Sequence, residues 1–372
     1  MVLRSSDPAI QRPIIKMKKY FRTEVEETDI YQIPYRPGIK LDQNESPWDI
    51  PIELKVAITE KLIKADWNRY PLTEDYKPIL RKLAKEHDVL LEQFVLSNGT
   101  NTIVQALISM IPHNSKVLIL DPSFSHYENQ IQLQGRKLVK VPLSEDFELL
   151  PERTITAIKK EKPALILIAN PNAPTGTLFD KKSLYRIIQM ANCPVVIDEA
   201  FFYFTAETAM DWLNDFSNLI ILRSFSRAAA LAGVRFGYAV TDSDIAHTIE
   251  KCLTPFRLSK ISCLIIEEIL NHPKYIQEHA QSIIKERGRL FSKLQTIDGV
   301  QVFPSEANFL LLRMDKAKEV TKKLFEDEKV VIRDVSNDTT LENCLRVTVG
   351  TPAENDMLLM ALKRVKNDLK DN

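Results

Sequence analysis

The fold is decided by two apolar runs and the loop that joins them, Leu219-Ile220-Ile221-Leu222-Arg223-Ser224-Phe225-Ser226-Arg227-Ala228-Ala229-Ala230-Leu231-Ala232-Gly233-Val234-Arg235-Phe236-Gly237-Tyr238-Ala239-Val240. Short apolar runs bounded by polar residues or glycine are typical of buried strands in a parallel sheet. The loop carries two hydroxyl groups, on Ser224 and Ser226, and two guanidinium groups, on Arg227 and Arg235. Such a loop at the carboxyl end of a strand favours the binding of a phosphate group.

Length, charge and cysteine content exclude several classes of protein. The 372 residues suffice for two or three domains, and the 50 acidic and 50 basic side chains balance, which argues against a nucleic-acid partner. No apolar run approaches the ~20 residues of a membrane span, and the first residues lack a secretory signal, so we expect a cytoplasmic protein without a membrane partner. The cysteines show neither a metal-binding spacing nor a disulfide framework, so no metal site is expected: Cys193, Cys252, Cys263 and Cys344.

Strand-like and helix-like segments alternate over residues 49–254, which predicts a large α/β domain. Strands are expected at 94–97, 117–120, 164–169 and 219–222. Pro255 begins a region of shorter, mixed elements, and we expect residues 255–372 to form a smaller α+β domain. Residues 1–48 are expected to form an arm that belongs to the small domain or to a dimer interface.

One strand leads into a candidate anion site. The run 94–97 is followed by Asn98-Gly99-Thr100-Asn101-Thr102 at the start of a predicted helix. A glycine turn with hydroxyl groups at a helix N-terminus can hold an anion, because free N–H groups and the helix dipole both point at it. The same residues would also serve as an ordinary helix cap, so the motif alone leaves both interpretations open.

The motifs together resemble the fold-type I pyridoxal-phosphate-dependent aminotransferases, most closely the histidinol-phosphate aminotransferase branch. Residues 224–238 resemble the pattern Ser-x-Ser-Lys, a few small residues, then Gly-x-Arg-x-Gly-Tyr. Residues 170–176 resemble Asn-Pro-Asn-Asn-Pro-Thr-Gly, residues 197–201 resemble Val-Asp-Glu-Ala-Tyr, and residues 345–350 resemble Leu-Arg-Val-Thr-x-Gly. The motifs keep the family's order from about Leu41 to the C-terminus, so the resemblance covers most of the chain.

The resemblance implies a set of contacts to pyridoxal phosphate. Phe124, with Tyr127 behind it, would stack on the ring, Asp198 would pair with the ring nitrogen as part of the catalytic machinery, and Asn172 belongs to the motif beside the ring. The contacts implied for the phosphate come from Tyr70, Gly99, Thr100, Asn101, Ser224, Ser226 and Arg235.

The resemblance also implies a small-molecule substrate and a homodimer. Arg346 would grip the substrate's carboxylate in a bidentate fork, with Asn44 from the substrate loop beside it. Arg333 could hold a second anionic group, although a surface ion pair is the simpler expectation for it. The homodimer follows because Asn44 and Tyr70 match residues that serve the neighbouring subunit's site in the family.

Three positions depart from the family pattern on one edge of the cofactor. The lysine position is Arg227, and the asparagine and tyrosine that donate to the cofactor's phenolic oxygen are Ala173 and Phe201. A guanidinium stays protonated and cannot form a Schiff base as a lysine does. Losing both donors to a buried phenolate would cost about 2–6 kcal/mol, at about 1–3 kcal/mol each, unless Arg227 itself donates to that oxygen. Pyridoxal phosphate is therefore expected without a covalent link, the alternative being a different phosphorylated ligand.

Three hypotheses follow for the function. The first is an aminotransferase-like enzyme that acts on an amino acid or phosphorylated amino compound by a non-standard mechanism, with Arg227 and Asp198 as its catalytic residues. The second is a lysine-independent enzyme of another reaction class that uses the pocket for a different phosphorylated ligand. The third is a non-catalytic ligand-binding homologue, which the retention of Arg346, Arg235 and Asp198 disfavours, because unpaired buried charges are costly.

Overall fold

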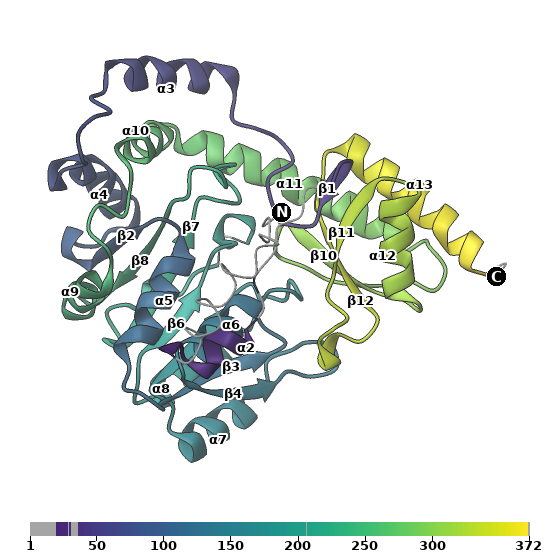
Figure 1. Ribbon diagram of the computed structural model, residues 1–372, viewed down its shortest axis with the longest axis horizontal. Helices are drawn as coiled ribbons and strands as arrows, with labels where there is room; N and C mark the ends of the chain where they lie inside the picture. Colours follow the sequence, from purple (N-terminus) through teal and green to yellow (C-terminus); the bar gives the residue numbers. More distant parts are fainter. Residues whose placement is uncertain (1–19, 29, 31–35, 206, 371–372) are drawn as a thin grey trace, which may run out of the picture.

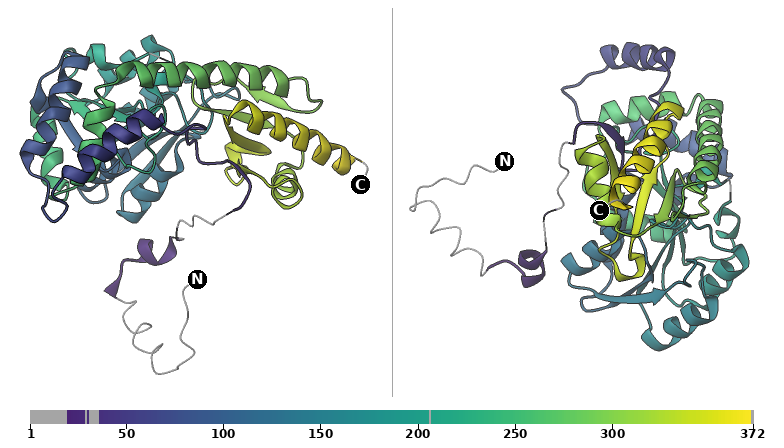
Figure 2. Two further views of the ribbon diagram at one scale, coloured as in Figure 1. Left: turned by 90° about the horizontal axis from the view of Figure 1, so that it is seen from above. Right: turned by 90° about the vertical axis from the view of Figure 1, so that its right-hand side faces the viewer.

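The computed structural model describes residues 20–28, 30, 36–205 and 207–370 (Figure 1). Residues 1–19 of the predicted arm and the last two residues lie outside the described part. Two sheets, each with its own helices, make up the molecule, and the long helix α11 (Pro273–Leu294) runs along both (Figures 1 and 2). Its Ile276 and Ile283 belong to a core of the larger part, and its Leu290 and Leu294 to the core of the smaller part.

The larger sheet has seven strands in the order β2-β8-β7-β6-β5-β3-β4. They are β2 (Phe94–Ser97), β3 (Lys116–Asp121), β4 (Lys137–Pro142), β5 (Leu165–Ala169), β6 (Val195–Asp198), β7 (Leu219–Ser224) and β8 (Gly237–Thr241). The strands from β7 to β4 pair in parallel, and β8 is antiparallel to both of its neighbours. The expected α/β class, with a mostly parallel sheet beside a smaller α+β part, is confirmed.

The prediction that residues 238–240 form a parallel strand is wrong. β8 pairs antiparallel with β7, with Ser224 opposite Gly237 and Ile221 opposite Val240. A parallel partner needs a crossover of a dozen or more residues, usually a helix, that carries the chain back to the strand's starting edge. Residues 225–236 form turns and no helix, so the chain reverses directly at the carboxyl end of β7.

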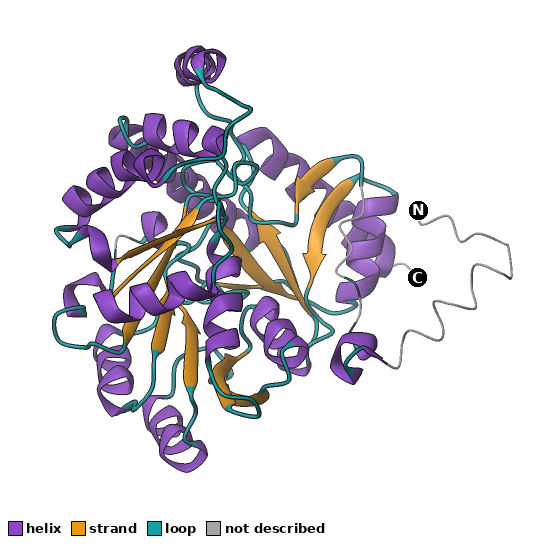
Figure 3. Cartoon of the chain, turned by 60° about the vertical axis from the view of Figure 1, so that its left-hand side comes forward, coloured by secondary structure: helices purple, strands orange, loops and turns teal. Residues whose placement is uncertain are grey.

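Helices lie on both sides of the large sheet (Figure 3), and alternate residues of its central strands enter two separate apolar cores. On one face Leu165 and Leu167 pack with α5 (Thr100–Met110), α6 (Ser125–Leu133) and α9 (Ser243–Cys252). On the other face Ile166 and Ile168 pack with α7 (Pro151–Glu161) and α8 (Lys181–Met190). The two-residue period of a strand sends successive side chains to opposite faces, so a sheet covered on both sides needs continuous apolar runs.

Three further helices cover the end of the sheet formed by β2 and β8: α3 (Ile52–Lys64), α4 (Thr73–His87) and α10 (Lys260–Ile269). α3 lies at the outside of the molecule and reaches the core through Leu54 and Ile58 (Figure 1). A short helix, α2 (Thr23–Glu27), lies near α6. Among the described residues, no helix combines the length and apolar character that crossing a membrane requires.

The smaller sheet has five strands in the order β1-β11-β12-β10-β9. They are β1 (Ile39–Leu41), β9 (Gln301–Phe303), β10 (Phe309–Arg313), β11 (Val330–Asp334) and β12 (Cys344–Thr348). α12 (Ala317–Glu326), α13 (Pro352–Lys370) and the second half of α11 pack on it. β1 pairs in parallel with β11, so the loop after β1, residues 42–45, begins at the small sheet.

Candidate active site

The predicted site residues follow the ends of strands at one edge of the large sheet. β2, β3, β5, β6 and β7 run in the same direction, so their carboxyl ends share that edge. Loops at the carboxyl ends of parallel strands are where open α/β sheets bind ligands. The small sheet supplies further residues through the 42–45 loop and the ends of β10 and β12.

Four of the residues predicted for the phosphate form a cluster of donors, which we call the anion cup: Thr100, Ser224, Ser226 and Arg235. Nη1 of Arg235 donates to Oγ of Ser226 at 3.2 Å, and the amide of Ser226 donates to Oγ of Ser224 at 3.2 Å. Thr100 opens α5 directly after Gly99, whose φ of 83° is favourable only for glycine. A β-carbon on Gly99 would lie 2.5 Å from Nη2 of Arg235, so the helix start and this guanidinium are neighbours.

Gly237 sets the distance between the helix start and the sheet. A β-carbon there would lie 2.8 Å from the amide nitrogen of Thr100 and 3.1 Å from the carbonyl oxygen of Arg223. Both contacts are with backbone, which cannot rotate away as a side chain can. The first residue of β8 must therefore be glycine for α5 to begin beside the end of β7.

Asp198, at the end of β6, is buried and held by two donors. The hydroxyl of Tyr127 donates to Oδ2 at 2.7 Å, and the amide of Ala200 donates to Oδ1 at 3.0 Å. Burial raises the pKa of this carboxyl, while the hydroxyl, the amide and the nearby Arg227 oppose the rise. Phe124 packs edge-on against Tyr127, with ring centroids 5.4 Å apart. The predicted ring residues thus lie together, with Tyr127 as the direct support of the carboxylate.

Arg227 is partly buried and reaches from the large sheet to the 42–45 loop. Its Nη1 donates to the carbonyl oxygens of Gln43 at 3.1 Å and Asn44 at 3.0 Å. Burial and the neighbouring Arg235 lower its pKa to about 10, which still leaves the side chain a cation at neutral pH. The guanidinium also lies 5.7 Å from the ring centroid of Phe201. Arg227 is therefore a fixed positive charge within the site.

The surroundings of Arg227 are apolar on one side. Ala173 and Phe201 are buried in one apolar core, and the ring of Phe201 packs edge-on against Phe309 at 5.4 Å. Asn172, fully buried, donates to the carbonyl of Pro122 at 3.1 Å and to Oγ1 of Thr175 at 3.0 Å, so its amide joins its own loop to the loop after β3. Neither Ala173 nor Phe201 offers a side-chain donor to a ligand.

The small sheet holds the 42–45 loop from the other side. Asn44 is buried with a φ of 54°, and its amide donates to Oγ1 of Thr348 at 2.9 Å. Its carbonyl oxygen, already bound by Arg227, also accepts from Nδ2 of Asn308 at 2.9 Å. Nη2 of Arg346 donates to the carbonyl oxygen of Asp42 at 2.7 Å. Side chains from both sheets thus converge on three consecutive carbonyl groups of this loop.

The other predicted residues lie less centrally. Asn101 follows Thr100 on α5, and its backbone contacts the ring of His126. Arg333 stands opposite Arg346 in the pairing of β11 with β12. Tyr70 is 73 % exposed and stacks on Phe256 at 4.5 Å, and it makes no recorded contact with the anion cup within the described part of this chain.

Two residues of the site were given no role from the sequence. Asn308 and Thr348 hold the loop, and Thr348 lies in the 345–350 segment that matches the family pattern. Their function depends on contacts with residues more than 260 positions away, which local sequence does not reveal. His279 contributes a further contact that no motif signalled, since its Nε2 lies 2.6 Å from Oγ of Ser46.

A cavity of about 410 Å³ adjoins the loop. Lys40, Glu45, Ser46, Gly233 and Thr348 are among the residues that line it. Lys40 forms an ion pair with Glu45. The cavity therefore opens beside the residues that surround Arg227.

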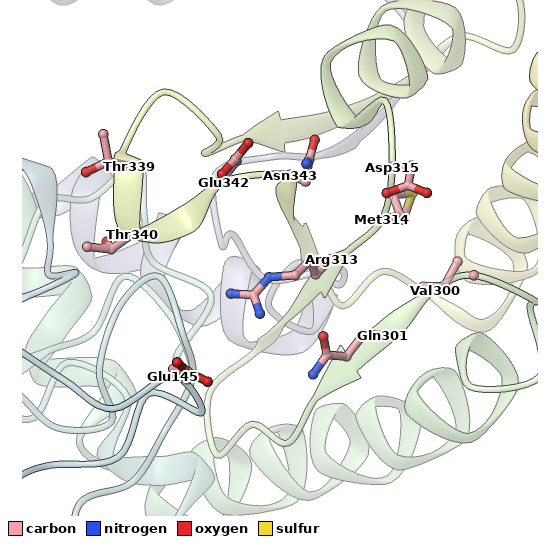
Figure 4. Close-up of a pocket in the computed structure, with 11 residues that line it drawn as sticks. Glu145, Val300, Gln301, Arg313, Met314, Asp315, Thr339, Thr340, Glu342 and Asn343 are labelled. Atoms are coloured by element: carbon pink, nitrogen blue, oxygen red, sulfur yellow. The ribbon is translucent and has the colours of Figure 1, made fainter.

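A larger cavity of about 870 Å³ lies apart from these residues, and Figure 4 shows Arg313 and Gln301 pointing into it. None of the predicted site residues lines it. The guanidinium of Arg313 faces the rings of Phe303 and Phe147. Three carboxylates line the same cavity. The anion cup, with the guanidinium of Arg235 and the hydroxyl groups of Thr100, Ser224 and Ser226, is the better candidate for an anionic ligand.

One group of carboxylates has metal-like spacing: Asp121, Glu128 and Asp338. Nζ of Lys140 lies 3.3 Å from Asp121 and 2.7 Å from Glu128, so an ammonium group already balances their charge. The carboxylates therefore have a partner in the fold.

Comparison with known proteins agrees with this geometry. Residues 36–362 match the model of the family described as aminotransferase class I and II. A histidinol-phosphate aminotransferase from Chlorobaculum tepidum is 36% identical over 329 residues, which cover 88% of this chain and 94% of that protein. The crystal structure of the histidinol-phosphate aminotransferase from Clostridium acetobutylicum is similar with a TM-score of 0.81 and 27% identity, covering 89% of this chain and 99% of that one. The enzyme from Sinorhizobium meliloti, in complex with pyridoxal-5′-phosphate, shares the fold with a TM-score of 0.84 at 22% identity, covering 94% and 98%.

The close approach at Gly237 can be tested with two glycine variants. We expect Gly237→Ala to push the start of α5 away from β7, to cost about 1–3 kcal/mol of unfolding free energy and to weaken the binding of inorganic phosphate. Gly233→Ala is the matched control, because a β-carbon at Gly233 would meet nothing within 4 Å. Urea unfolding and calorimetric titration with phosphate measure both effects. Equal behaviour of the two variants would contradict the role given to Gly237.

Proposed function

Because the chain belongs to the class I and II aminotransferase family, we propose that it is a histidinol-phosphate-aminotransferase-like enzyme that binds its phosphorylated ligand without a covalent link. The substrate class is an amino acid or phosphorylated amino compound. One observation carries the proposal: the side chain beside Asp198 and the anion cup is a guanidinium anchored on the carbonyl groups of Gln43 and Asn44.

The phosphate end of the site fits pyridoxal phosphate. The start of α5, the hydroxyl groups of Ser224 and Ser226 and the guanidinium of Arg235 supply donors within one cluster. A dianionic phosphate gains from charge-assisted hydrogen bonds and from the helix dipole at the same place. These residues would hold the phosphate group of the ligand whichever class of reaction the enzyme catalyses.

The ring end also fits this cofactor. Asp198 would pair with the ring nitrogen, and Tyr127 would orient that carboxylate through its hydroxyl group. When bound, pyridoxal phosphate would supply an electron sink through its ring nitrogen. A cationic nitrogen beside Asp198 would favour the charged carboxylate, which burial alone disfavours.

The edge of the site formed by Arg227, Ala173 and Phe201 does not fit the covalent attachment of pyridoxal phosphate. Arg227 is a cation at neutral pH, with a pKa of about 10, and a guanidinium is neither a nucleophile nor a base there. Ala173 and Phe201 pack in an apolar core and donate no hydrogen bond. Arg227 would instead stabilise negative charge on a bound ligand.

This edge favours a second candidate, a lysine-independent enzyme of another reaction class that uses the same cup for a different phosphorylated ligand. Both candidates keep Arg346 for a carboxylate, since its guanidinium reaches the loop beside Asn44. They differ in whether pyridoxal phosphate is the ligand that fills the cup.

The absence of a covalent link can be tested by reduction with borohydride. We expect purified protein mixed with pyridoxal phosphate to carry no reduced cofactor on residues of the site, because no lysine stands at position 227. Arg227→Lys should gain the mass of the reduced cofactor at residue 227 and a measurable transaminase turnover. Peptide mass spectrometry identifies the modified residue.

Two results would count against the proposal in different ways. Fixation of the cofactor on Lys40, which lines the adjoining cavity, would show that another lysine serves the site. An Arg227→Lys variant that binds pyridoxal phosphate no better than the parent would favour the second candidate.

We further propose a homodimer formed through α3 and the segment after it. Ile52, Val56 and Ile63 form an exposed apolar stripe on α3, and Trp67 and Tyr70 continue it with 68 % and 73 % of their surface exposed. Clustered large apolar side chains on a surface are typical of protein–protein interfaces. A second copy covering this stripe would bring Tyr70 toward the partner's site.

Light scattering on a sizing column tests the dimer. Ile63→Asp should shift the protein from dimer to monomer, because it places a charge in the centre of the stripe. Met360→Asp is the control, since Met360 is an exposed apolar residue on α13. A parent protein that elutes as a monomer at micromolar concentration would exclude this interface.

A further inference from the structure

Only part of the Arg227 guanidinium is engaged by the protein. Nη1 makes the two hydrogen bonds to the 42–45 loop. Among the hydrogen bonds of the described residues, none is donated by its Nε or Nη2. These two N–H groups form one planar edge, and that edge matches the two oxygens of a carboxylate. The loop carbonyls therefore fix the guanidinium while leaving a two-donor edge for a ligand.

The charged side chains around Arg227 also do not form a direct ion pair with it. The charged groups that influence the pKa of Arg227 are Arg235, Glu45 and Asp198. Asp198 accepts from Tyr127 and from the amide of Ala200, and Glu45 pairs with Lys40. No carboxylate of the described chain forms an ion pair with Arg227.

Arg223 is a buried arginine of the same strand region whose charge is paired within the protein. It stands four residues earlier, and its guanidinium lies 2.8 Å from Oε2 of Glu199, with both side chains almost fully buried. Thr208 accepts a further hydrogen bond from its Nη2 at 2.8 Å. A buried cation is normally satisfied in this way. Arg227 differs because its hydrogen bonds within the described chain go to carbonyl groups and not to a carboxylate.

We propose that the Nε–Nη2 edge of Arg227 binds a carboxylate of the ligand whose phosphate lies in the anion cup. The inference rests on the proposed phosphate site and goes beyond it by naming the ligand class, a phosphorylated compound that carries a second anion. An aldehyde accepts from this edge without a charge of its own and so gains less than a carboxylate does, and an ammonium group is repelled by it. The site selects for negative charge at the position where a lysine enzyme would need an aldehyde.

A series of ligands that share one phosphorylated ring tests the selection directly. 4-Pyridoxic acid 5′-phosphate, pyridoxine 5′-phosphate and pyridoxamine 5′-phosphate carry a carboxylate, an alcohol and an amine at the same ring position. Calorimetric titration should give the carboxylate a Kd about tenfold to a hundredfold below that of the alcohol, since hydrogen bonds to charged groups contribute that much. The amine should bind most weakly.

Variants at position 227 separate charge from loop support. Arg227→Met should abolish the advantage of the carboxylate over the alcohol, and the ratio of the two Kd values is insensitive to a general loss of affinity. Arg227→Gln keeps an N–H donor for the loop carbonyls without the charge, and should lose the same ratio while melting closer to the parent. Arg364→Met is the control, because Arg364 is 65 % exposed on α13 and pairs only with Glu328 there.

The outcomes distinguish this inference from the proposed function. A carboxylate ligand that binds no more tightly than the alcohol, or a ratio unchanged in Arg227→Met, overturns the role of Arg227 and leaves the phosphate site intact. Failure of every probe, inorganic phosphate included, to bind overturns the proposed phosphate site and this inference with it.

Discussion

The structure around the candidate site depends on the hydrogen bonds from Arg227 to the carbonyl oxygens of Gln43 and Asn44. The 42–45 loop starts at the small sheet, and Arg227 follows the end of β7 in the large sheet. A guanidinium suits this position because its planar donors stay protonated and can bind two carbonyl groups at once. A lysine ammonium could also donate to two carbonyls, but it has no planar edge of two donors to offer a ligand.

The two ends of the site differ in how the protein balances charge. At the ring end, Asp198 is buried with hydrogen bonds from Tyr127 and from a backbone amide, and the nearby Arg227 also favours its charged form. At the other end, Arg227 and Arg235 are neighbouring cations, and burial together with Arg235 lowers the pKa of Arg227. Since two neighbouring cations are costly in a partly buried place, the binding of an anionic ligand relieves both.

The sequence predicted much of the fold because short apolar runs mark buried strands. The runs at β2, β3, β5 and β7 were recognised within one or two residues. β4 was not, because it lies at the edge of the sheet and Lys137 and Lys140 interrupt its apolar pattern. The direction of β8 was predicted wrongly, since the apolar pattern of a strand does not record which way it runs.

The residues of the site could be predicted where they belong to one loop. They were harder to predict where segments far apart in the sequence meet. Ser224, Ser226 and Arg235 belong to one loop, and the structure brings them together. Asn308 and Thr348 hold Asn44 across more than 260 residues, and motif order alone gave them no role. Tyr70 lies on the surface of a single chain, so a role for it in the site depends on a second copy.

A crystal structure of the protein with a phosphorylated carboxylate bound would test the role of Arg227 most directly. We expect Nη1 of Arg227 to remain on the carbonyl oxygens of Gln43 and Asn44, with the ligand's carboxylate on the Nε–Nη2 edge and its phosphate beside Ser226 and Arg235. A guanidinium withdrawn from the loop, or a ligand joined covalently to a lysine, would contradict it.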